Sequence, residues 1–272
     1  MTWKRVVTAA LLIPIVVGLV LYGSTAAVAV ATAVIVLLAL VEYFRLGDAV
    51  GHRAYRLWTA TCALVLIFVQ YTADVVEFFG ARNGVGEVFF LFVVGIGVLT
   101  LFTKRPMVEA LPSAGISSSA LLLVAFPLTY AIRLHGVAQG PVLLLFALVI
   151  TWVGDSVAYF VGGAFGKNPL APHLSPKKTW EGSVASFAGS LVVAVIFRRW
   201  LNASLPLLLG MAAVGNVAGQ MGDLLESAYK RSVGVKDSGG LLPGHGGVLD
   251  RIDALILTIP VVWYYWILCC AA

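Results

Sequence analysis

The densest group of chemically capable side chains in the sequence lies between residues 222 and 253. This stretch holds five acidic and four basic side chains, although only 11% of the 272 residues are charged. Carboxylates can hold a divalent cation, and basic side chains can neutralise phosphates. The combination predicts metal-assisted phosphate chemistry. The acidic residues are Asp223, Glu226, Asp237, Asp250 and Asp253, and the basic residues are Lys230, Arg231, Lys236 and Arg251.

The acidic residues have a spacing that would bring them together on two helices. Asp223, Glu226 and Lys230 share one face if their helix continues past the membrane edge. Asp250 and Asp253 are three positions apart at the start of the next apolar run. The helix dipole alone would account for acidic residues at a helix start, but not for Asp223 and Glu226 near a helix end. We expect Asp223 and Asp250 to hold one divalent cation, and Glu226 and Asp253 to support it.

The loop between these two helices is rich in glycine. Five glycines within nine residues exceed what one turn requires, and they would let the backbone approach a phosphate or move on binding. His245 lies among them, and it could contact a phosphate, donate a proton or hold the loop. Asp237 could order the loop or bind a second cation. The glycines are Gly239, Gly240, Gly244, Gly246 and Gly247.

A second polar motif precedes this stretch. Lys177 and Lys178 are suited to binding a phosphate, either of a nucleotide or of an anionic lipid headgroup. Thr179 and Ser175 are candidates for capping the helix that follows. Asp155 lies near a predicted membrane boundary, where a charge is costly unless it is paired or functional. We therefore expect this motif to belong to the same site.

The elements that carry these motifs are predicted to be membrane-spanning helices. Hydrophobic residues make up 60% of the sequence, above the roughly 45–50% of soluble domains. A spanning helix needs about 20 mostly apolar residues. We predict an all-α integral membrane protein of nine helices, four in residues 1–110 and five in residues 111–272, forming one continuous membrane domain. The predicted spans are 6–22, 25–44, 55–71, 88–103, 112–132, 141–163, 181–201, 204–224 and 252–270.

The basic residues provide an independent test of this topology, because they concentrate in cytoplasmic loops. With the N-terminus in the cytoplasm and the C-terminus outside, fourteen of the eighteen Lys and Arg residues fall on the cytoplasmic side. Both polar motifs fall on that side as well, so we expect the active site to face the cytoplasm. Membrane orientation also accounts for the net charge of +5, and we expect no nucleic-acid partner.

The charge-dense stretch resembles the signature of the phosphatidate cytidylyltransferases, also called CDP-diacylglycerol synthases. The resemblance covers Ser-Ala-Tyr-Lys-Arg at 227–231, Lys-Asp-Ser-Gly at 236–239, and Leu-Pro-Gly-His-Gly-Gly-Val-Leu-Asp-Arg-Ile-Asp at 242–253. Tyr229 departs from the family, which usually has an aliphatic residue or Phe there. The segment Ser-Pro-Lys-Lys-Thr-Trp-Glu-Gly at 175–182 is similar to a second segment of the same family.

The resemblance implies transfer of a cytidylyl group from CTP to phosphatidate, giving CDP-diacylglycerol and pyrophosphate. It also implies a homodimer. The carboxylates themselves favour Mg²⁺, with room for a second cation, and the compact chain without an extended polar N-terminus favours a bacterial plasma membrane. The expected catalytic residues are Asp223, Lys230, Lys236, Asp237, His245 and Asp250. The expected substrate-binding residues are Asp155, Ser175, Lys177, Lys178, Thr179, Ser227, Arg231, Gly246, Gly247 and Arg251.

Three other classes of membrane protein compete with this interpretation. A transporter or channel would place charges in the middle of the membrane and often contains paired interrupted helices, whereas these charges cluster at helix ends. A polyprenol kinase that uses CTP would share the metal and nucleotide sites but would transfer the terminal phosphate. A membrane scaffold would not require the charge density of residues 222–253.

Overall fold

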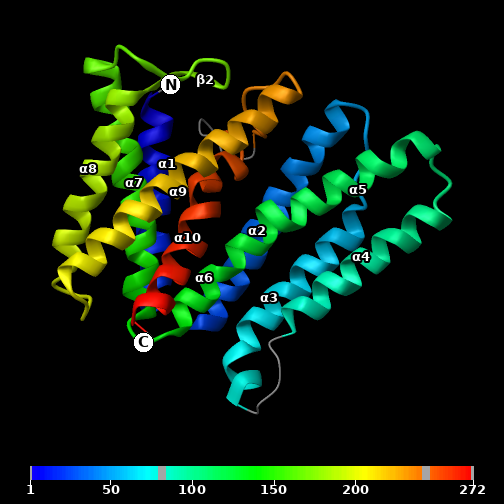
Figure 1. Ribbon diagram of the computed structural model, residues 1–272, viewed down its shortest axis with the longest axis horizontal. Coiled ribbons are helices and arrows are strands. Elements are labelled where there is room, and N and C mark those ends of the chain that lie inside the picture. The colour runs from blue at the N-terminus through cyan, green and yellow to red at the C-terminus, as the bar shows by residue number, and fades with distance from the viewer. Residues whose placement is uncertain (1, 79–83, 241–245, 271–272) are drawn as a thin grey trace.

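The computed structural model describes residues 2–78, 84–240 and 246–270. Helices dominate this part of the chain (Figure 1). The first half contains α1 Thr2–Tyr22, α2 Thr25–Ala49, α3 Arg56–Phe78, α4 Val85–Phe102, the 3₁₀ turn η1 Met107–Glu109, α5 Ala110–Ser119, the π-helical segment η2 Ala120–Ala125 and α6 Phe126–Gly136. The second half contains α7 Gly140–Phe165, β1 Pro169–Ala171, β2 Ser175–Thr179, α8 Trp180–Phe197, α9 Leu205–Ser232 and α10 Leu249–Cys270.

The helices have the lengths and compositions that a membrane requires. In the described part of the chain, eight are long and apolar enough to cross one, and the first helix adds a shorter apolar stretch, Ala10–Tyr22. Both of the short predicted spans, 55–71 and 88–103, correspond to helices, α3 and α4. The prediction of a polytopic all-α membrane protein is confirmed.

The predicted span 112–132 differs in detail, because it forms part of a longer irregular helical run, Met107–Gly136. Its middle, η2, is π-helical and ends two residues before Pro127. Proline has no backbone N–H to donate to the preceding turn, so the regular hydrogen-bond ladder is interrupted there. The sequence predicted the span but not this irregularity.

A short antiparallel hairpin, β1 and β2, leads into α8 and was not predicted. Pro169 pairs with Thr179, and Ala171 pairs with Ser175. Ser175 precedes Pro176, which restricts it to extended backbone, so the expectation that Ser175 caps a helix is wrong. Thr179 does cap α8, because its side-chain oxygen accepts a hydrogen bond from the N–H of Gly182 at 3.2 Å.

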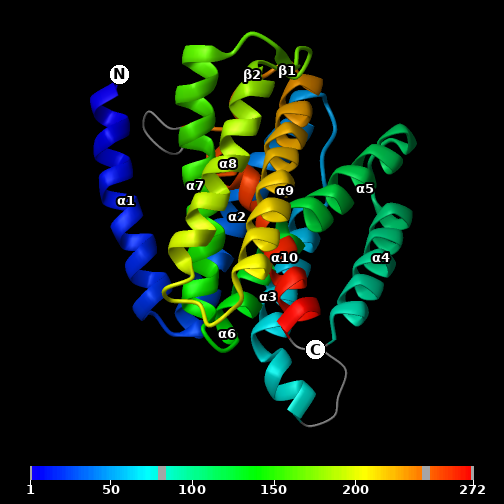
Figure 2. The same cartoon turned by 60° about the vertical axis from the view of Figure 1, so that its left-hand side comes forward.

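The elements that carry the two polar motifs lie at one end of the helical bundle. Helices α7, α8, α9 and α10 pack side by side, and α3, α4 and α5 lie on the other side of α2 and α6 (Figures 1 and 2). The β1–β2 hairpin, the end of α9 and the start of α10 share the end of the bundle at which α1 begins, and α10 finishes at the opposite end. The predicted co-location of the two motifs is therefore confirmed.

Candidate active site

Helix α9 brings its polar residues out of the apolar part of the chain on one continuous helix. The helix runs to Ser232. It therefore continues far enough to place Asp223, Glu226 and Lys230 on one helical face, as their spacing required. Its packing against α10 is close at Gly222, where a Cβ atom would lie 2.5 Å from the carbonyl oxygen of Asp253. Glycine at this position therefore lets the acidic end of α9 approach the acidic start of α10.

A cavity of about 270 Å³ opens between α7, β2, α8 and α9. Its charged walls are Asp155 from α7, Lys177 and Lys178 from β2, and Asp223 from α9. We call it the hairpin cavity, because the β1–β2 hairpin forms one wall. Four residues that the sequence placed in two separate motifs thus face the same space.

Within the hairpin cavity, opposite charges are paired. The Nζ atom of Lys178 lies 2.5 Å from Oδ2 of Asp223, and the two side chains are 27% and 29% exposed. Asp155 is close enough to interact electrostatically with Asp223, Lys178 and Arg251. Such a mixture of carboxylates and ammonium groups around one cavity suits a ligand that carries phosphates together with a cation.

A third carboxylate belongs to the same electrostatic group. Asp253 lies one turn into α10 and interacts with Asp223 and Asp155. Its side chain accepts a hydrogen bond from the N–H of Ala254 at 2.7 Å. Arg251, from the same turn, is exposed and balances part of this negative charge at Asp155.

A polar network that the sequence analysis missed adjoins the hairpin cavity, and its members Ser183, Ser186 and Gln220 line the cavity. Asn216 donates to Oγ of Ser186 at 2.9 Å, and Gln220 donates to Oδ1 of Asn216 at 2.7 Å. Ser183 donates to the side chain of Gln220. The available signal was the spacing of these residues by three or four positions within otherwise apolar spans, which predicts one polar stripe on each helix.

The other acidic residues of the signature support the loop between α9 and α10. Asp250 accepts hydrogen bonds from Nζ of Lys230 at 2.7 Å, from the N–H of Gly247 at 2.8 Å and from the N–H of Ser238 at 3.1 Å. Lys230 also forms an ion pair with Glu226. The Glu226 and Asp250 side chains are only 4% and 6% exposed. We call the described loop residues, 233–240 and 246–248, the anchored loop.

Glu42 of α2 is a second anchor of this loop, and the sequence analysis missed it. Its residue is 1% exposed. Its carboxylate accepts hydrogen bonds from the N–H of Leu249 at 2.8 Å, from the N–H of Val248 at 3.0 Å and from Oγ of Ser238 at 3.1 Å. The available signal was an acidic residue inside the apolar run 25–44, where a charge requires a partner.

The glycines of the anchored loop make room for these carboxylates. A Cβ atom would lie 2.5 Å from Glu42 at Gly239 and 2.3 Å from Glu42 at Gly247. Gly246 has a φ of +81°, which favours glycine, and a Cβ atom there would meet Asp250 at 2.7 Å. Close packing against protein carboxylates therefore accounts for these three glycines. Gly244 and His245 lie outside the described residues.

The remaining predicted residues occupy different settings. Arg231 donates to the carbonyl oxygens of Leu174 at 3.2 Å and Val235 at 2.9 Å, so it joins the β1–β2 turn to the anchored loop. Ser227 is buried. Lys236 and Asp237 are exposed on the anchored loop, and the structure shows no side-chain partner for either of them among the described residues.

The carboxylates are divided between two places rather than gathered around one point. Among the residues that the structure describes, no three His, Cys, Asp or Glu side chains form a group that could hold a metal ion. Instead, Lys178 pairs with Asp223 and Lys230 pairs with Asp250. Asp223 and Asp250, the two predicted principal metal ligands, thus each bind a lysine ammonium group. Both offer hard oxygen donors of the type that Mg²⁺ prefers.

Comparison with known proteins assigns this arrangement to an enzyme class. The chain matches the cytidylyltransferase family over residues 3–269 and belongs to that family. This family points to dependence on a divalent cation in general. The family prediction made from the signature is confirmed, as is its implication of a nucleotidyltransferase embedded in a membrane.

Individual relatives narrow the class. The chain is 36% identical over 209 residues to the phosphatidate cytidylyltransferase of Bacillus subtilis, a match that covers 74% of this chain and 76% of the relative. It is 38% identical over 181 residues to that of Thermotoga maritima, covering 63% and 65%. The phosphatidate cytidylyltransferase of Haemophilus influenzae is 44% identical over 140 residues, and this match spans 48% of each chain.

Proposed function

We propose that this chain transfers the cytidylyl group of CTP to phosphatidate, giving CDP-diacylglycerol and pyrophosphate. The observation that carries the proposal is the hairpin cavity, in which Lys177, Lys178, Asp155 and Asp223 face one space at the end of a bundle of apolar helices. A lipid phosphate held at a membrane edge and a soluble nucleotide can both reach such a position. Membership in the cytidylyltransferase family supports this assignment.

The reaction places modest demands on acid–base chemistry. An oxygen of the lipid phosphate attacks the α-phosphorus of CTP, and the bond to the β-phosphate oxygen breaks to release pyrophosphate. With a second pKa near 6, a phosphate monoester is already mostly dianionic at neutral pH. The enzyme therefore needs to bring two polyanions together and to stabilise charge on the leaving group, which is electrostatic work.

The basic residues have different proposed roles, because some line the hairpin cavity and others are held by protein groups. Lys177 and Lys178 line the hairpin cavity, and we assign them to the phosphates of the substrates. Lys230 is enclosed by Glu226 and Asp250, and we assign it to holding these carboxylates in place. Arg231, which joins the β1–β2 turn to the anchored loop, keeps the two polar motifs in register.

We propose that one divalent cation binds Asp223 and Asp250, with Glu226 and Asp253 in support, and that binding requires the two carboxylates to exchange Lys178 and Lys230 for the cation and to move closer together. Their carboxylate oxygens suit Mg²⁺, and the lysines now paired with the first two residues indicate that both accept positive charge. A bound cation would neutralise phosphate charge and polarise the phosphoryl oxygen. We also propose a homodimer in a bacterial plasma membrane, with the hairpin cavity on the cytoplasmic face.

One incubation tests the reaction directly. Purified protein in detergent is mixed with phosphatidate, MgCl₂ and CTP labelled at the α-phosphate, and lipids are separated from nucleotides. We expect label in a lipid product, and we expect EDTA to abolish it. Labelled lipid from γ-labelled CTP would show terminal phosphate transfer instead and would overturn the proposal. The exposed Glu87→Gln variant, altered at the start of α4, serves as a folded control.

A further inference from the structure

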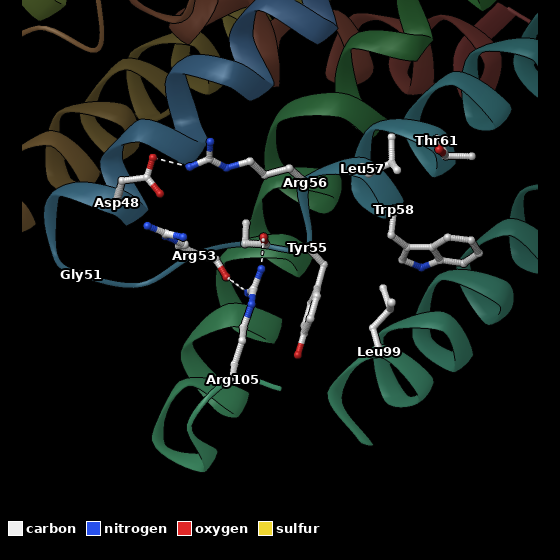
Figure 3. A pocket seen from close by; sticks show the side chains of 11 residues that line it. Asp48, Gly51, Arg53, Tyr55, Arg56, Leu57, Trp58, Thr61, Leu99 and Arg105 are labelled. Carbon is white, nitrogen blue, oxygen red and sulfur yellow. Dashed lines mark hydrogen bonds and ion pairs between the residues drawn. The ribbon is translucent and has the colours of Figure 1, made fainter. Parts of the chain in front are cut away.

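A second and larger cavity lies on the other side of α2. It has a volume of about 960 Å³ and opens between the α2–α3 connection and the end of α4 (Figure 3). It shares no lining residue with the hairpin cavity. The reaction proposed above gives it no role.

One side of this cavity is strongly basic. Its lining includes three arginines and a single acidic residue, Asp48. Arg105 has a structural role. It donates hydrogen bonds to the carbonyl oxygens of Arg53 and Ala54, and its guanidinium carbon lies over the ring of Tyr55, 5.0 Å from the ring centroid. Because three arginines face one aspartate, the cavity has a net positive charge, which a negatively charged ligand would complement.

The other two arginines remain accessible. Arg56 pairs with Asp48, but the two side chains are still 49% and 36% exposed. The side chain of Arg53 has no hydrogen bond or ion pair among the described residues, and in Figure 3 it extends along the same side of the cavity as Asp48 and Arg56. Guanidinium groups recognise phosphate through paired N–H donors, so Arg53 and Arg56 fit an anionic phosphate.

The opposite side of the cavity is apolar. Leu57 is 83% exposed, and Trp58 and Leu99 face one another beside it (Figure 3). The indole N–H of Trp58 donates to the carbonyl oxygen of Phe92 at 3.1 Å, which fixes the ring. Tryptophan at the end of a spanning helix is typical of the membrane interface. A ligand in this cavity would thus have a charged end and a hydrocarbon end.

We propose that this cavity binds an anionic phospholipid as a site separate from the hairpin cavity. The headgroup phosphate lies against Arg53 and Arg56, and an acyl chain lies along Leu57, Trp58 and Leu99. A volume near 960 Å³ is at the upper end of typical ligand sites, which suits a headgroup with the first part of its chains. The positive charge would attract any phosphate, and the apolar side favours a phospholipid over a small free anion.

Native mass spectrometry of the purified full-length protein tests this site without measuring activity. The protein is titrated with phosphatidylglycerol and, separately, with zwitterionic phosphatidylcholine. We expect preferential retention of phosphatidylglycerol. Arg53→Gln removes a cation that has no partner among the described residues, and it leaves the Arg56–Asp48 pair intact. The fold is therefore preserved, and the affinity for phosphatidylglycerol falls about fivefold, as expected for one basic residue at an anionic headgroup.

The matched control is Arg198→Gln, which removes the same charge from an exposed position at the C-terminal end of α8, and it is expected to change nothing. Equal effects of Arg53→Gln and Arg198→Gln would overturn the proposal. So would loss of phosphatidylglycerol in Lys177→Gln alone, which would place the lipid in the hairpin cavity, or full displacement by inorganic phosphate. Because the readout is binding, failure of this proposal is distinguishable from failure of cytidylyl transfer.

Discussion

Two sets of acidic and basic side chains lie at the same end of this molecule, and they differ in exposure. In the hairpin cavity, Lys178 and Asp223 are more than a quarter exposed and have each other as ion-pair partner. Beneath the anchored loop, Glu226 and Asp250 are almost fully buried, and Asp250 accepts hydrogen bonds from three different residues. The first set lines a cavity that a substrate can enter, and the second holds a loop.

The difference shows how one signature can combine two tasks. The residue types are the same in both sets, and their spacing along α9 is continuous. Their partners decide what each residue does, because a buried carboxylate with several donors is fixed in position, whereas an accessible one with a single partner can exchange it for a ligand. Substitutions should therefore separate the two sets experimentally.

The largest effect is expected from Asp223→Asn in the hairpin cavity. Loss of this charge removes one strong contact to the cation and the partner of Lys178, so we expect turnover to fall at least about 100-fold. Steady-state rates with labelled CTP measure the change, and the Mg²⁺ concentration for half-maximal rate should rise. Near-normal turnover would remove Asp223 from the site. Glu87→Gln is the matched control.

Asp250→Asn is expected to reduce turnover at least about 100-fold as well, but with a second consequence. The Ser238 and Gly247 amides lose a charged acceptor, so hydrogen exchange in the anchored loop should accelerate. Exchange there should remain unchanged in Asp223→Asn. If both variants left exchange unaltered, the distinction between the two sets would be wrong.

Glu42→Gln tests the anchor that comes from α2. The uncharged amide offers one acceptor oxygen in place of two, and we expect the free energy of unfolding to fall by about 2 kcal/mol, the usual size for hydrogen bonds to a charged group. Loop exchange should also accelerate, as in Asp250→Asn. Denaturant unfolding in detergent and hydrogen exchange measure the two effects. An unchanged loop would show that Glu42 does not position it.

Lys177→Gln is expected to affect binding more than turnover. Lys177 lines the hairpin cavity and forms no ion pair with a carboxylate in the described part of the chain, so its loss removes a phosphate contact made in the bound complex. We expect the KM of one substrate to rise about tenfold while kcat changes little. Lys167→Gln, exposed just before β1, is the control. A fall in kcat alone would assign Lys177 to the transition state instead.

The smallest effect concerns the cap of α8. Thr179→Val removes the acceptor for the Gly182 N–H, which costs about 1 kcal/mol of stability. Thermal unfolding measures this loss. Thr179→Ser retains the hydroxyl and should restore stability. Equal stability of the two variants would show that the cap bond contributes little, and lower activity of Thr179→Ser would indicate contact of the methyl group with a substrate.

The sequence was sufficient for the helices and for the grouping of the two motifs. Long apolar runs specify spanning helices almost directly, since the backbone must satisfy its own hydrogen bonds in lipid. The spacing of Asp223, Glu226 and Lys230 places them on one face only if their helix continues beyond the predicted span 204–224, and α9 does continue to Ser232. The β1–β2 hairpin was missed because the segment was interpreted as a loop that leads into and caps the next helix, although Pro176 favours extended backbone at Ser175.

The partners of the charged residues could not be predicted, because they depend on contacts between distant segments. The sequence around residue 42 does not indicate that the Glu42 carboxylate accepts hydrogen bonds from the backbone N–H groups of Val248 and Leu249, which lie some 200 positions later. The loop glycines were therefore interpreted as approaching phosphate. Two of them, Gly239 and Gly247, leave space for Glu42 instead.

This contact also limits how the protein can be recombined. Consider a chimera that joins the first 110 residues of one relative to the remainder of another. The carboxylate at position 42 would then come from one parent, and the loop amides and glycines that pack against it would come from the other. An acidic residue at 42 and glycines at 239 and 247 must then be inherited together. Genetic exchange at the boundary near residue 110 should succeed only between parents that share all three.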